Sequence, residues 1–106
     1  LSGINPISNT IPLSFNLYQN YPNPFNPSTN IAFDVAKTGF VTLRIYDILG
    51  REIETIVNQE LKPGKYEVQW PGRTGGYASD HTSGVYFYTL IADGNRIDTK
   101  KLILLK

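Results

Sequence analysis

Several short segments of the chain alternate between apolar and polar residues. Residues 30–35, 41–46 and 65–70 each place an apolar side chain at every second position, which is the period of a strand with one buried face. No segment keeps an apolar period of 3.6 residues over enough turns to indicate a helix. The pattern therefore predicts an all-β protein.

Two further segments depart from simple alternation. Residues 51–57 end in adjacent Ile56 and Val57, which predicts either a β-bulge or the end of the strand. Residues 85–92 are apolar or aromatic at almost every position, so side chains on both faces favour a central strand.

Turn signals separate these segments and define the fold class. Asp93-Gly94 predicts a two-residue hairpin into a last strand at 96–105, because both positions favour positive φ. About seven short antiparallel strands, with Trp70 on a middle one, predict an immunoglobulin-like β-sandwich. An open barrel is the alternative topology.

Residues 1–13 differ in composition from the rest. Pro6 and Pro12 among Ser, Asn and Thr predict an extended linker or donor segment, which leaves 14–106 as the domain. The apolar residues within 1–13 are unusual for a free linker. We therefore expect this segment to lie along its own domain, an upstream domain or a neighbouring copy. Starting without methionine or a leader-like stretch, the chain reads as a mature product or an excised module.

Composition narrows the function classes. The 106 residues are 41% hydrophobic, enough for one domain with a core. Ten basic and nine acidic residues give a net charge of +1, which predicts no nucleic-acid partner. Cysteine is absent, which rules out disulfides and thiolate chemistry.

Few residues are candidates for catalysis. His81, the one histidine, lies beside Asp80 in the glycine-rich segment 71–83, where too few partners accompany it for a nucleophile or a metal site. Glu52 and Glu54 share one strand face that is expected to meet solvent. We predict no enzyme activity, catalytic residue, metal or cofactor.

Carbohydrate binding through exposed rings is an alternative, since β-sandwiches can present rows of aromatic side chains. Against it, strand alternation predicts partial burial of most of the tyrosines concerned. These are Tyr46, Tyr66, Tyr77, Tyr86 and Tyr88.

Residues 21–27 read Tyr-Pro-Asn-Pro-Phe-Asn-Pro. The three prolines lack an N–H and fix φ, and the two asparagines can turn the backbone by local hydrogen bonds. This chemistry predicts a stiff corner between strands in preference to a recognition motif.

That run belongs to one of four motifs that occur in order, at residues 18–29, 45–51, 83–88 and 100–106. Together they resemble the type A C-terminal sorting domain of the type nine secretion system, over about residues 14–106. The resemblance implies an immunoglobulin-like address that follows an upstream cargo domain. It implies passage through the periplasm of a Gram-negative bacterium to the cell surface or medium, with an outer-membrane secretion receptor and a sortase-like peptidase as partners.

Carried over residue by residue, the family motifs are mainly structural at nine positions: Pro22, Asn23, Pro24, Phe25, Gly50, Arg51, Gly84, Val85 and Tyr86. The partner-binding candidates lie in the last motif: Lys100, Lys101, Leu102, Leu104 and Lys106. An apolar strand bracketed by lysines can pair by its edge with a receptor while the cations meet carboxylates. Equally, the lysines can guard an edge strand against aggregation.

Pro71 and the long segment after it depart from the family pattern, which weakens any inference about contacts through that loop. A rival function is an extracellular structural module that self-associates. In it, residues 1–13 would donate a strand to a neighbouring copy, and open-ended donation would give filaments.

Overall fold

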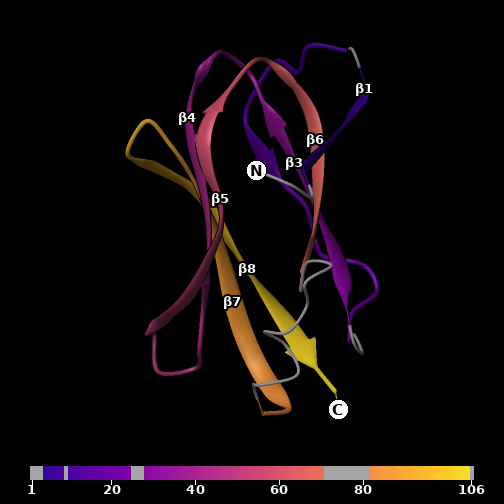
Figure 1. The fold of residues 1–106 in the computed structure, drawn as a ribbon, viewed down its shortest axis with the longest axis vertical. Coiled ribbons are helices and arrows are strands. Elements are labelled where there is room, and N and C mark those ends of the chain that lie inside the picture. The colour runs from indigo at the N-terminus through magenta and orange to yellow at the C-terminus, as the bar shows by residue number, and fades with distance from the viewer. Residues whose placement is uncertain (1–3, 9, 25–27, 71–81, 106) are drawn as a thin grey trace.

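The computed structural model describes residues 4–8, 10–24, 28–70 and 82–105, in which eight strands form two antiparallel sheets (Figure 1). One sheet has the order β1-β6-β3-β2 and the other β5-β4-β7-β8. The strands are β1 (Ile4–Ser8), β2 (Asn16–Leu17), β3 (Thr29–Val35), β4 (Gly39–Tyr46), β5 (Glu52–Leu61), β6 (Gly64–Trp70), β7 (Gly84–Ala92) and β8 (Asn95–Leu104). The predicted all-β, immunoglobulin-like sandwich is confirmed.

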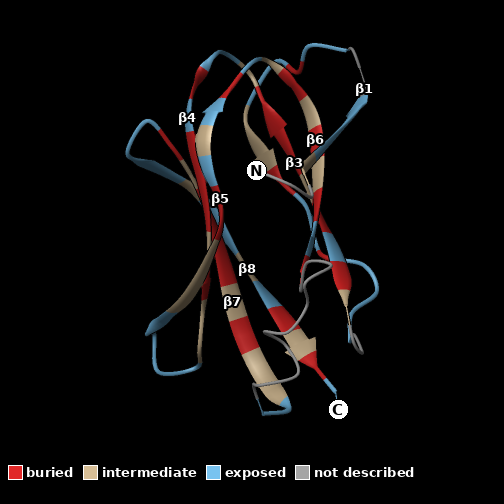
Figure 2. Ribbon diagram, viewed as in Figure 1, coloured by how far each residue is buried: buried red, intermediate tan, exposed pale blue. Residues whose placement is uncertain are grey.

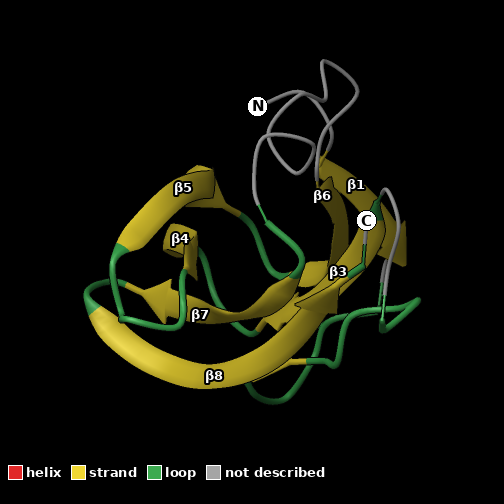
Figure 3. Cartoon of the chain, turned by 90° about the horizontal axis from the view of Figure 1, so that it is seen from below, coloured by secondary structure: helices red, strands yellow, loops and turns green. Residues whose placement is uncertain are grey.

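The core lies between the two sheets, which Figure 3 shows on end, and it is formed by buried positions on strands of both sheets (Figure 2). Trp70, Tyr88 and Phe33 are its largest fully buried side chains. Removing an apolar side chain of this size from water contributes roughly 1.5–3 kcal/mol. The period-two pattern therefore predicts the buried faces of β3, β4 and β6 correctly.

The break in alternation on β5 is a bulge. Leu43 of β4 pairs with Val57 and the next residue, Arg44, pairs with Thr55, which leaves Ile56 as the extra residue. A bulge of this kind lets two consecutive apolar side chains, Ile56 and Val57, both be buried.

β7 is central in its sheet, between β4 and β8, as its composition predicts. Its turn into β8 is the predicted two-residue hairpin, with positive φ at Asp93 (49°) and Gly94 (83°) and with Ala92 opposite Asn95. This hairpin makes the C-terminal strand β8 the edge of the sheet.

The N-terminal segment contributes an edge strand to the other sheet. Ile4 of β1 lies opposite Val68 and Pro6 opposite Tyr66, so β1 pairs with β6 of its own chain. Of the three surfaces considered for residues 1–13, the structure places β1 on its own domain. Donating β1 to a neighbour would require it to leave β6.

Candidate recognition site at the C-terminal strand

The end of β8 presents two different faces. Leu102 and Leu104 are 0% and 1% exposed and belong to the core, whereas Leu105 is 51% exposed and Lys101 lies in solvent. Ile103 is half-buried on the same outer face as Lys101. In the folded domain, a partner can reach Lys101, Ile103 and Leu105, but not the side chains of Leu102 and Leu104.

The other predicted partner-binding residues flank this outer face. Lys100 is half-buried, and its Nζ lies 3.5 Å from Asp98 Oδ2. Lys106 lies outside the described residues.

The first family motif crosses from the sheet of β3 to the edge of β8 and is held by a buried tyrosine. The Tyr88 hydroxyl donates to the Tyr18 carbonyl (2.7 Å) and accepts from the Asn20 backbone N–H (2.8 Å). Burial raises the pKa of Tyr88 to about 12, so this hydroxyl remains a donor at a higher pH than an ordinary tyrosine does.

Asn20 continues this anchor inside the motif. Its buried amide Nδ2 donates to the Thr29 hydroxyl (2.9 Å) and to the Pro22 carbonyl (3.2 Å), and Thr29 Oγ1 also donates to Pro22 (2.8 Å). The Tyr21-Pro22 and Asn23-Pro24 peptide bonds are cis. The predicted corner therefore has its own polar network.

Two exposed amides of the same motif reach the backbone of β8. Gln19 Nε2 donates to the Lys101 carbonyl (2.7 Å), and the Ile103 N–H donates to Asn23 Oδ1 (3.0 Å). The sequence indicated a local turning role for Asn23 and gave no signal of a partner 80 residues away. Phe25, which belongs to the same motif, lies outside the described residues.

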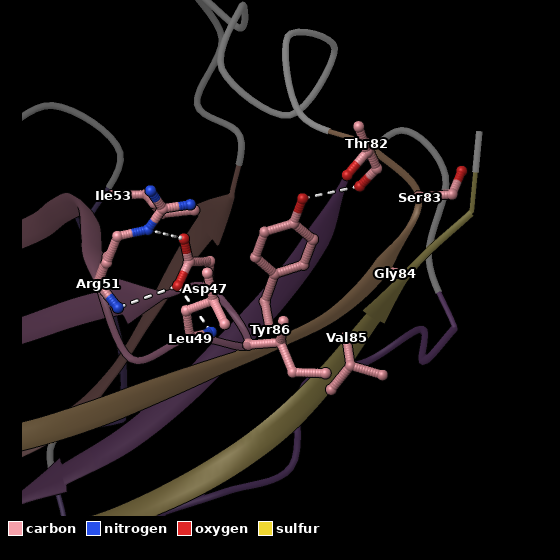
Figure 4. Close-up of a pocket in the computed structure, with 10 residues that line it drawn as sticks. Asp47, Leu49, Arg51, Ile53, Thr82, Ser83, Gly84, Val85 and Tyr86 are labelled. Carbon is pink, nitrogen blue, oxygen red and sulfur yellow. Dashed lines mark hydrogen bonds and ion pairs between the residues drawn. The ribbon is translucent and has the colours of Figure 1, made fainter.

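The second and third motifs meet where the turn between β4 and β5 lies beside the start of β7. Residues of both motifs line a cavity of about 470 Å³ there (Figure 4). Gly50 supplies the turn, with φ at 84°. The Asp47 carboxylate accepts bonds from the Arg51 backbone N–H (2.9 Å), from Leu49 N–H (2.9 Å) and from Arg51 Nε (2.8 Å). The Arg51 backbone bond is the main cause that lowers the pKa of Asp47.

The third motif closes the opposite wall of this cavity. β7 begins at Gly84, Val85 lines the cavity, and the Tyr86 hydroxyl donates to the Thr82 carbonyl (2.7 Å). Tyr86 itself is 6% exposed and stacks edge-on against Trp70. These contacts hold the β4–β5 turn and the start of β7 in place. The Asp47 carboxylate takes part in this structural role through its bonds to Leu49 and Arg51.

The remaining candidates for chemistry do not converge in the described part of the chain. Glu54 accepts a bond from Trp70 Nε1 (2.6 Å) and Glu52 one from Thr55 Oγ1 (2.6 Å), so the two carboxylates have separate partners. Within the described ranges, no three His, Cys, Asp or Glu side chains gather as metal ligands. Asp80 and His81 lie outside those ranges.

The tyrosines that could stack against a carbohydrate are mostly buried in the described part of the chain. Tyr66, Tyr86 and Tyr88 are core residues, at 9%, 6% and 0% exposure, and Tyr46 is half-buried. Tyr77 lies outside the described residues.

No described helix is long and apolar enough to span a membrane.

Comparisons with known proteins agree with the motifs. A family model described as secretion system C-terminal sorting domain matches residues 19–105. Among solved structures, dimeric latent PorU from Porphyromonas gingivalis is similar, with a TM-score of 0.66 and 19% identity over 86% of this chain. The alignment covers 9% of the PorU chain, so this likeness concerns the fold of one small part of it. No curated protein matches.

Proposed function

This chain belongs to the secretion system C-terminal sorting domain family, and on that premise we propose how it directs an attached cargo. As a family member it is a sorting signal for the type nine secretion system, which exports proteins to the cell surface or the extracellular space. The family is defined by sorting and not by catalysis.

We infer that the cargo reaches the periplasm first and that an outer-membrane receptor then binds this domain. A sortase-like peptidase would release the cargo at the surface. The observation that carries the proposal is the family match, which runs from the first motif to Leu105 and so includes the C-terminal strand.

The outer face of β8 is the proposed contact. Leu102 and Leu104 hold the strand in the core, and this packing displays Lys101 and Leu105 to solvent with Ile103 beside them. A receptor with carboxylates beside an apolar patch would complement this face, because interfaces combine a buried apolar centre with a charged rim. Lys100 and Lys106 would extend the basic rim.

The structure changes which variants test this contact. Deleting residues 101–106 would remove two core leucines and destabilise the fold, so a loss of export would say little about recognition. Lys101→Glu combined with Leu105→Ser alters only exposed side chains. We expect this pair to reduce export of a fused periplasmic reporter roughly tenfold, which corresponds to about 1.4 kcal/mol of lost binding.

The matched control makes the same two changes elsewhere. Lys37→Glu combined with Leu13→Ser alters an exposed lysine in the β3–β4 turn and a fully exposed leucine. Export is measured as the fraction of reporter outside the cell at equal expression. Equal export by the two double variants would reject the outer face of β8 as the contact.

A further inference from the structure

A β-sandwich with two open sheets has four edge strands, here β1, β2, β5 and β8. Edge strands are usually protected against pairing with other chains by shortness, proline, charge or bulges. β2 has only two residues, and β1 contains Pro6 and an irregular register. β5 carries exposed Glu52 and Glu60 and two irregularities against β4.

On β8, charge is present only before the strand's last residues, with Lys100 and Lys101 nearest to them. Residues 102–105 are uncharged and apolar, and the irregularity in the β7–β8 ladder lies far away, between Leu90 and Ile91. An uncharged apolar edge strand is the kind that adds a further strand most readily.

This is the stretch that the first motif covers. The Lys101 carbonyl and the Ile103 N–H point away from β7. The carbonyl accepts a bond from the Gln19 side chain, and the N–H donates to the Asn23 side chain, so neither bonds to the β7 ladder. An amide side chain offers the same donor and acceptor groups as a backbone peptide. Gln19 and Asn23 therefore occupy the positions of a neighbouring strand's N–H and C=O.

The outward Lys101 carbonyl and Ile103 N–H can also pair with the same two groups of a second copy of β8. In an antiparallel ladder, every second pair of opposed residues exchanges both of its N–H and C=O bonds. If a second β8 aligned about a two-fold axis at Leu102, Lys101 of each copy would lie opposite Ile103 of the other. Each Lys101 carbonyl would then accept the partner's Ile103 N–H, and no lysine would directly oppose a lysine.

We propose that the outer edge of β8 at residues 101–103 can pair with β8 of a second copy of this chain to form a homodimer. The side-chain hydrogen bonds of Gln19 and Asn23 to this edge block that pairing. The backbone of their segment is anchored independently, by the buried Tyr88 hydroxyl and by Asn20 and Thr29. The two closing amides can therefore be removed without removing the anchors. This proposal does not depend on the receptor contact.

The test is the oligomeric state of Gln19→Ala combined with Asn23→Ala, measured by sedimentation velocity up to about 100 µM. We expect the wild-type chain to be a monomer and the double variant to form a dimer. Gln69→Ala is the matched control, because Gln69 is exposed and its amide donates to Ser28 Oγ (3.3 Å), away from β8. It should remain monomeric.

A third substitution identifies the edge that pairs. Ile103→Pro removes the outward N–H but no bond to β7, so in the double variant it should restore the monomer. A double variant that stays monomeric would overturn the proposal, as would a dimer that survives Ile103→Pro.

Hydrogen exchange gives a second readout that does not need the double variant to fold. Asn23→Ala alone should accelerate exchange at the Ile103 amide about fivefold to tenfold, because that N–H loses its acceptor. An unchanged exchange rate would show that Asn23 does not close the edge.

Discussion

Leu102→Ala is expected to lower the free energy of unfolding by about 2–5 kcal/mol. Leu102 is fully buried on β8, opposite Tyr86 of β7, so truncation loses apolar burial and leaves a cavity between the sheets. Urea unfolding followed by the fluorescence of the one tryptophan, Trp70, measures the change. Leu105→Ala is the control and should stay within about 0.5 kcal/mol, since that side chain is half exposed.

This prediction separates a role in folding from a role in recognition. If Leu102→Ala reduces export, the loss should be in proportion to the fraction of unfolded domain. A Leu102→Ala domain that is as stable as the wild type but is not exported would contradict the assignment of this leucine to the core.

Tyr88→Phe should cost about 1–3 kcal/mol, the second largest effect we expect. The substitution keeps the ring but removes the hydroxyl that accepts from the buried Asn20 N–H and donates to the Tyr18 carbonyl. The buried donor is then left without its partner. Tyr21→Phe is the control, because that ring is 79% exposed and the same change should be nearly neutral.

The pH dependence gives the same residue an independent test. Tyr88 loses its proton at about pH 12 in the folded chain and near pH 10 when unfolded. Between these values the unfolded state binds fewer protons, so stability falls as the pH rises from 10 to 12. Tyr88→Phe should reduce this fall. An identical alkaline slope in wild type and variant would contradict the raised pKa.

Local sequence patterns predict much of this fold. Period-two alternation identifies β3, β4 and β6 with their buried faces, whereas β1 and β2 are not predicted as strands. The Ile56-Val57 pair and Asp93-Gly94 identify a bulge and a hairpin. These features depend on neighbouring residues, so the sequence carries them directly. The same alternation places Leu102 and Leu104 on one face, whereas the lysines around them suggest an exposed binding strand.

Contacts between distant segments could not be predicted in the same way. Asp34 lies at a polar position of its alternating strand yet is 2% exposed, because Asn16 Nδ2 (3.0 Å), the Tyr18 hydroxyl and Lys65 Nζ (3.3 Å) surround its carboxylate. The Tyr18 bond to this carboxylate raises the pKa of Tyr18. Such partners are fixed by the pairing of β2, β3 and β6, which no local pattern encodes.

The candidate recognition site shows the same division. The last motif indicates the correct strand, but which of its residues a partner can reach depends on packing between the sheets. The amides of Gln19 and Asn23 gave no sign of their contacts with β8, since an amide side chain is equally common in an isolated turn. For residues 1–13, the apolar composition left three surfaces open, and only the pairing of β1 with β6 distinguishes them.

The central claim is that this folded domain acts as a sorting signal. The most direct test fuses residues 1–106 to the C-terminus of an inert periplasmic reporter. It compares a bacterium that has the type nine secretion system with the same strain lacking it. The account predicts that the reporter reaches the surface or the medium only when both the domain and the system are present. A reporter that stays in the periplasm of the intact strain, or leaves equally well without the system, would contradict it.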